Sequence, residues 1–212
     1  MTPQKLVRIG GIGMILSGLA LGYSYISHPH HMTPDTIAAP FWILIHTLFA
    51  ISLMLGLLAT TALYATTIER AGGWGLVGFV SLFFGMMLIF GLDYYEVLIA
   101  PYLALHYPQV IVDHGAGDAM GPIALFFPLA GALTVCGYAM LAFGWMQGAV
   151  LPKAVALGVI VSSLAFGFGL GPLGSLMTAR ITAAGFGAAL VAMGILAWKG
   201  RSFAARPGRQ IQ

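Results

Sequence analysis

The stretch Gly91-Leu92-Asp93-Tyr94-Tyr95-Glu96-Val97-Leu98-Ile99-Ala100 closes the third long apolar run of the sequence and carries two carboxylates. Asp93 and Glu96 are three residues apart, so in a helix they share one face. A charged acid near the centre of a membrane helix costs roughly 2.5–3.5 kcal/mol on insertion scales. We therefore expect both acids to face a protein interior, a partner or water, and to mark a functional site.

The composition around this stretch is that of a membrane protein. Of 212 residues, 59% are hydrophobic and only 7% are charged, whereas soluble proteins carry roughly a quarter charged residues. The mean hydropathy is +0.94, which predicts an all-α, polytopic fold in contact with a lipid bilayer. The single cysteine, Cys136, excludes a disulfide framework or a cysteine-based metal cluster within one chain.

Six apolar runs approach the roughly 20 residues that a bilayer core requires. We expect spanning helices over about 9–26, 40–66, 75–99, 122–146, 154–170 and 175–198. Residues 1–198 then form one six-helix bundle, and 199–212 form a basic, disordered tail. The third helix is expected to stop or kink at Pro101, with a short interfacial helix over 101–108. Small residues at Gly18, Gly22 and along 183–189 are suited to helix packing, within the chain or between copies.

The basic residues define an orientation. With six spans, both termini and the turns after the second and fourth helices lie on one side. That side holds eight of the nine basic residues: Lys5, Arg8, Arg70, Lys153, Lys199, Arg201, Arg206 and Arg209. The positive-inside rule therefore predicts cytoplasmic termini in a bacterial inner membrane. The positive net charge follows from this topology, and we expect no nucleic-acid partner.

Ionisable residues gather on the opposite, outer side. His46 lies about six residues into the second helix, Asp93 and Glu96 approach the outer end of the third, and Arg180 begins the sixth. We expect these four groups to converge in the outer leaflet, with Arg180 as counter-ion of Asp93 or Glu96 in an ion pair or a proton relay. A shell of loop histidines covers this layer: His28, His30, His31, His106 and His114.

The sharpest local motif is His28-Pro29-His30-His31-Met32. Imidazoles suit copper, zinc or haem iron, and a thioether favours Cu(I). Three histidines in a loop are also typical of a solvated turn, and His46 alone is typical of a core histidine that bonds to a neighbouring helix. A haem with two histidine ligands inside the bundle is disfavoured, because the first, fourth, fifth and sixth helices contain no histidine.

Trp42 and several tyrosines are interpreted as members of interfacial aromatic belts. The order of residues resembles that of a widespread type of small bacterial six-helix integral membrane protein. Those proteins carry a His-Pro after the first helix, a Trp and a His early in the second, and an acid late in the third, matched here by His28-Pro29, Trp42, His46 and Glu96. The resemblance implies that His46 and Glu96 act as a unit, and it implies no activity.

Three classes of function remain open. The leading hypothesis is a protein that binds a metal, a haem or another ligand at the outer site, and that takes part in redox chemistry. The second is an accessory subunit of a larger membrane complex or a homo-oligomer, and the third is a small proton-coupled transporter. Sequence signatures of hydrolases, zinc proteases, P-loop proteins and dinucleotide-binding enzymes are absent. Catalysis inside the membrane is therefore the weakest interpretation.

Overall fold

The computed structural model describes residues 1–115, 123–171, 174–200 and 203. Its regular elements within those ranges are all helical, and six of the helical segments are long and apolar enough to span a bilayer, as the sequence predicted. The long helices are α1 (Pro3–Ser27), α3 (Pro40–Ala65), α4 (Ile68–Tyr94), α7 (Ile123–Gln147), α8 (Lys153–Leu170) and α9 (Leu176–Trp198). The chain is an integral, multi-pass membrane protein that contacts the lipid bilayer.

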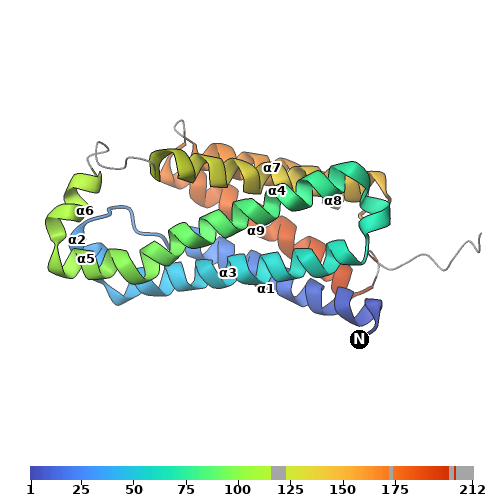
Figure 1. Cartoon of the computed structure of the whole chain (residues 1–212), viewed down its shortest axis with the longest axis horizontal. Coiled ribbons are helices and arrows are strands. Elements are labelled where there is room, and N and C mark those ends of the chain that lie inside the picture. The colour runs from blue at the N-terminus through green and yellow to red at the C-terminus, as the bar shows by residue number, and fades with distance from the viewer. Residues whose placement is uncertain (116–122, 172–173, 201–202, 204–212) are drawn as a thin grey trace, which may run out of the picture.

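The long helices form a closed ring. Their extensive contacts run in the order α1, α3, α4, α7, α8, α9 and back to α1. Figure 1 shows the helices side by side, with the N-terminus at one end of the bundle and three short helices at the other. We call the first end, where α1 begins and α9 ends, the basic end. The second, where α1 ends at Ser27 and α3 begins at Pro40, is the histidine end.

The contact between α1 and α9 depends on the absence of side chains at two pairs of glycines. A Cβ atom added to Gly18 in α1 would lie 2.5 Å from the carbonyl oxygen of Gly187 in α9, and the reverse contact is equally short. Gly11 and Gly194 meet in the same way one heptad further along. Small residues thus let the first and last helices touch through their backbones. Gly187 therefore packs inside the chain, whereas Gly185 faces outward and meets nothing within 4 Å.

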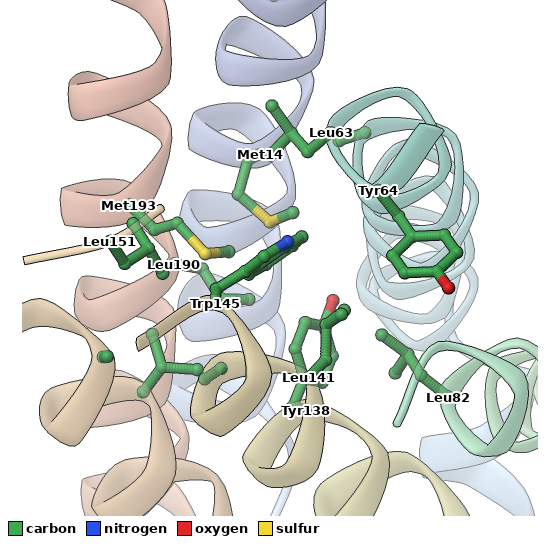
Figure 2. Close-up of a cluster of buried hydrophobic side chains, with 14 of the residues drawn as sticks. Met14, Leu63, Tyr64, Leu82, Tyr138, Leu141, Trp145, Leu151, Leu190 and Met193 are labelled. Atoms are coloured by element: carbon green, nitrogen blue, oxygen red, sulfur yellow. The ribbon is translucent and has the colours of Figure 1, made fainter. Parts of the chain in front are cut away.

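The basic half of the ring is filled by side chains. Its core includes Met14, Leu63, Leu82, Trp145 and Met193, all nearly inaccessible to solvent. Figure 2 shows these residues converging from several helices. Trp145 also donates a hydrogen bond from Nε1 to the Thr67 hydroxyl at 2.8 Å, which satisfies the indole N–H away from water.

The third spanning segment differs from its predicted form. It begins at Ile68 rather than near residue 75, with a break at Gly72, where φ is +61°. It also continues past Pro101 through a π-helical turn, η1 (Tyr95–Ile99), and α5 (Ala100–His106). The helix does not stop at Pro101: it changes from π-helical to α-helical form just before this proline, which falls in the first turn of α5.

The histidine end has a small core of its own. The short helices α2 (Pro34–Ala38), α5 and α6 (Pro108–Gly115) pack there. Buried side chains join them to the start of α3 and include Ile37, Trp42, Ala104 and Ile111. The interfacial helix expected over 101–108 corresponds to α5 and the start of α6. Of the predicted disordered tail, residues 201–202 and 204–212 lie outside the described part, and Phe203 packs against Trp145.

Candidate functional site

A hydrogen-bonded pair of ionisable side chains joins α3 to α4 inside the bundle. His46 Nδ1 lies 2.7 Å from Asp93 Oδ1. The two side chains are only 12% and 3% exposed. His46 lies six residues after Pro40, which starts α3, and Asp93 is the penultimate residue of α4. We call this pair the dyad.

The hydrogen bond determines which atoms of the dyad are available to a ligand. An ionised carboxylate only accepts, so His46 donates through its Nδ1–H. His46 Nε2 and Asp93 Oδ2 are both buried and have no hydrogen-bond partner among the described residues. Most buried polar atoms in native proteins have such a partner, which makes these two atoms the strongest indication of a binding site.

Trp42 lies directly over His46. One helical turn separates the two residues, and their ring centroids are 4.5 Å apart. The Trp42 Nε1–H donates to the backbone carbonyl of Glu96 at 3.1 Å. That carbonyl lies in η1, and π-helical turns frequently occur at functional sites. Trp42 is not a member of the interfacial belt that its sequence position predicted, because its side chain is only 1% exposed. The four-residue spacing from His46 was the signal that could have found it.

His28 completes the aromatic group around the dyad. Its ring centroid is 5.2 Å from that of Trp42 and 5.5 Å from that of His46. The Nδ1–H donates to the carbonyl oxygen of Pro29 at 3.0 Å, which leaves Nε2 as the unprotonated nitrogen of the neutral ring. Burial lowers the pKa of His28, and the charges of His46 and Arg180 lower it further, against the opposing effect of the Pro29 bond.

Arg180 binds the loop that follows α1. Its guanidinium lies 2.9 Å from His30 Nε2 through one terminal nitrogen, and the other terminal nitrogen donates to the His28 carbonyl. The Arg180 Nε atom is buried without a partner in the described chain. The ion pair predicted for Arg180 is not formed with Asp93, whose carboxylate bonds to His46 instead. A pair between Arg180 and Glu96 stays a prediction.

The remaining site residues of the sequence analysis lie further out. Glu96 is half-buried in η1, one turn beyond Asp93. His31 is exposed beside His30, and His106 is exposed on α5 with its ring 4.5 Å from that of Tyr102. His114 belongs to α6, and its side chain lies outside the described residues. The structure therefore brings His28 to the dyad and places His30 on Arg180.

The described residues contain no group of three or more His, Cys, Asp or Glu side chains that could hold a metal ion. Two imidazoles, those of His28 and His46, lie side by side with their ring centroids 5.5 Å apart.

A cavity of about 410 Å³ lies within the ring; along α3 and α4 it ends one turn on the basic side of the dyad, and along α7 and α8 it extends to the histidine end. All six long helices contribute to its wall, which is mostly apolar. Sequence reasoning missed it, because only the ring arrangement of the helices creates it. Tyr138 and Leu190 lie both in the cavity wall and in the filled core, so the cavity ends where that core begins.

Together these features define a six-helix integral membrane protein with a buried histidine–aspartate dyad above an apolar cavity. The sequence matches no protein-family model and no curated protein, and no solved structure matches it.

Proposed function

We propose that this protein binds a small ligand in the outer leaflet of the membrane, with the dyad as the polar anchor. One observation carries the proposal: His46 Nε2 and Asp93 Oδ2 belong to the same hydrogen-bonded pair, and each is buried and unpartnered in the described chain. An unsatisfied buried polar group costs roughly 1–3 kcal/mol. A ligand that bonds to either atom recovers that atom's share of the free energy on binding.

The location in the outer leaflet rests on the charge distribution. Lys5 and Arg8 lie in the first turns of α1, at the basic end of the ring. The dyad lies towards the opposite end, near the start of α3. The positive-inside rule supports cytoplasmic termini and a dyad that faces the outside of a bacterial inner membrane.

The filled basic half favours binding over transport. Trp145 and Met193 are almost inaccessible and close the ring between the cavity and the basic end. A substrate path through the ring would have to displace this densely packed core. The cavity is therefore closed towards the basic end, as a binding site requires.

A second candidate function is metal binding by the same residues. Metal-ligating histidines usually donate their other ring N–H to a carboxylate or a backbone carbonyl. His46 does so to Asp93, and His28 does so to Pro29. Both Nε2 atoms thus have the orientation partners that a copper, zinc or haem-iron ligand normally has.

The test is the composition of protein purified gently from its native membrane. His46→Asn keeps an N–H close to the position of Nδ1, for Asp93, and removes Nε2. We expect a small molecule or a metal to co-purify with the wild type and to be at least about tenfold depleted in His46→Asn. The bound metal and small molecules are measured by absorption spectroscopy, elemental analysis and mass spectrometry of extracted molecules.

The matched control is Asp35→Asn, which changes an exposed acid in α2. It should retain the wild-type complement of bound molecules. Identical compositions in the wild type and His46→Asn would contradict the proposal. A near-stoichiometric metal or a Soret band would select the second candidate function.

A further inference from the structure

We propose that the ligand is a membrane-dissolved amphiphile with an apolar chain and an uncharged hydroxyl head. The chain fills the ring cavity, and the head lies towards the dyad. This inference rests on the proposed function and specifies the class of ligand.

The cavity has the size and lining of a site for an apolar molecule. Its volume of about 410 Å³ falls within the roughly 300–1,000 Å³ of typical ligand pockets. The wall includes Leu21, Leu53, Ile89 and Val135. Four of its few polar side chains bond within the protein: Ser17, Ser52, Thr134 and Tyr138. Ser17, for example, donates to the Ser52 carbonyl at 2.8 Å. Such a wall rewards burial of hydrocarbon and offers little to a charged solute.

The cavity and the dyad belong to the same helix faces. Phe49 lines the cavity three residues after His46, and Ile89 lines it four residues before Asp93. Tyr25 lines it three residues before His28. In helices these spacings place the paired residues one above the other, about one 5.4 Å turn apart. A ligand that fills the cavity therefore ends within one turn of the dyad.

Tyr25 forms the boundary between the two parts of the site. Its ring packs edge-on against Phe49 at 5.4 Å and against Phe166 at 5.0 Å. Tyr25 also lines the cavity, so its phenol adds one hydroxyl to a wall that is otherwise mostly apolar.

The unpartnered atoms select the head group. Asp93 Oδ2 accepts hydrogen bonds, and His46 Nε2 accepts when the imidazole is neutral and donates when it is protonated. A hydroxyl donates one hydrogen bond, to Asp93 Oδ2 or to a neutral His46 Nε2, and it can also accept one from Nε2 when the imidazole is protonated. A carboxylate or phosphate head would be repelled by Asp93, and an ether would leave Oδ2 without a donor.

The cavity reaches the lipid-facing surface between α7 and α8. Phe127 of α7 and Leu164 and Phe168 of α8 line it, and their side chains are 48%, 46% and 60% exposed. A large apolar side chain at that surface contacts acyl chains in a bilayer. A ligand dissolved in the membrane therefore enters sideways without crossing water.

The test uses the full chain in lipid nanodiscs, with hexadecan-1-ol as the probe and its methyl ether as the matched compound without a hydroxyl donor. Thermal unfolding is followed at increasing mole fractions of each, because a ligand that binds only the folded state raises the midpoint. We expect the alcohol to raise the midpoint and to bind at least about tenfold more tightly than the ether. Equal affinities, or no shift with the alcohol, would overturn the inference.

Two glycine variants locate the binding. Added Cβ atoms at Gly131, in the cavity wall, and at Gly158, on the exposed face of α8, meet nothing within 4 Å. Gly131→Phe therefore fills the cavity without a backbone clash, and it should abolish the shift. Gly158→Phe should keep it. A full shift in Gly131→Phe would place the alcohol elsewhere and contradict the inference.

The two proposals fail separately. A native ligand that is lost in His46→Asn, together with no response to the alcohol, overturns the amphiphile and leaves the proposed function intact. Identical native compositions in the wild type and His46→Asn, together with no response, overturn both.

Discussion

Asp93 Oδ1 accepts a hydrogen bond from His46 Nδ1 across 2.7 Å, and this contact joins two helices that are adjacent in the ring. Trp42, one turn before His46 in α3, donates to the Glu96 carbonyl in η1, which continues α4. His46 and Trp42 therefore both join α3 to the third spanning segment. Each bond places a polar group of one helix against the other helix, at a depth where water does not compete. The geometry of the site is therefore coupled to the stability of this helix pair.

Loss of the carboxylate should destabilise the fold more than loss of its charge. Asp93→Ala leaves the His46 N–H buried without an acceptor, and we expect the free energy of unfolding to fall by about 1–3 kcal/mol. Asp93→Asn keeps an acceptor oxygen and should lose less. Asp35→Ala, on the exposed α2, should stay within about 0.5 kcal/mol of the wild type. Denaturant unfolding in detergent micelles measures all three, and equal losses for Asp93→Ala and Asp35→Ala would contradict the prediction.

Trp42→Phe keeps an aromatic ring over His46 but removes the hydrogen bond to the Glu96 carbonyl. The η1 turn then loses a side-chain contact, and we expect its backbone amides to exchange hydrogen faster, by a factor of about 3–10 for a bond worth roughly 1 kcal/mol. Hydrogen exchange followed by mass spectrometry on peptides over residues 95–101 measures the change. Unchanged exchange there would show that the indole N–H does not stabilise the turn.

Arg180 and His30 should be energetically coupled. Arg180→Met and His30→Ala each remove one side of their 2.9 Å contact, so the double variant should lose less stability than the sum of the single losses. We expect a coupling of about 0.5–1 kcal/mol for a partly exposed contact. The same cycle with Glu96→Gln tests the ion pair predicted from the sequence. Additive losses in either cycle would rule out that contact.

The lowered pKa of His28 makes stability depend on pH. Its pKa falls below the ordinary 6.5, mainly through burial, so the unfolded chain binds the proton more readily than the folded one. Stability is then complete above about pH 6.5 and is lost as the pH falls through the folded-state pKa. His28→Asn keeps a donor for Pro29 and removes this titration. The thermal midpoint of the variant should fall less than that of the wild type between pH 7.5 and 5, and parallel curves would contradict the assignment.

Gly18→Ala and Gly185→Ala form a matched pair of variants. Gly18 lies in the contact between α1 and α9, and Gly185 lies on the outer face of α9. The first adds a Cβ that would lie 2.5 Å from the Gly187 carbonyl, whereas the second adds one in open space. We expect Gly18→Ala to lower the free energy of unfolding by about 1–3 kcal/mol through overpacking. Gly185→Ala should be neutral or stabilising because alanine favours the helix. Equal changes in the free energy of unfolding for the two variants would show that the contact between α1 and α9 tolerates an added methyl group.

Composition and run length were sufficient to predict six spanning helices, because the bilayer sets both the length and the polarity of a span. Residue position along those spans also placed His46 and Asp93 at comparable depths. Residue position did not show in which direction each side chain points around its helix. His46 was therefore grouped with Glu96 by resemblance, and Arg180 was matched by charge to Asp93 or Glu96, whereas the structure bonds Asp93 to His46.

The π-helical turn explains a second difference. Asp93 and Glu96 were expected to share a face on the basis of 3.6 residues per helical turn. The wider turn at Tyr95–Ile99 changes that spacing, and Asp93 is buried while Glu96 is only half-buried. No local pattern in the sequence announces such a turn. The cavity was equally hidden, because it depends on which helices become neighbours.

The glycine seam between α1 and α9 joins the first helix to the last. During synthesis the N-terminal helices enter the membrane well before α9 exists, so the ring stays open until the final span is inserted. The cavity and the Arg180 contact with the loop after α1 form only at that last step. A chain that ends before α9 can therefore span the bilayer but cannot close the ring around the cavity.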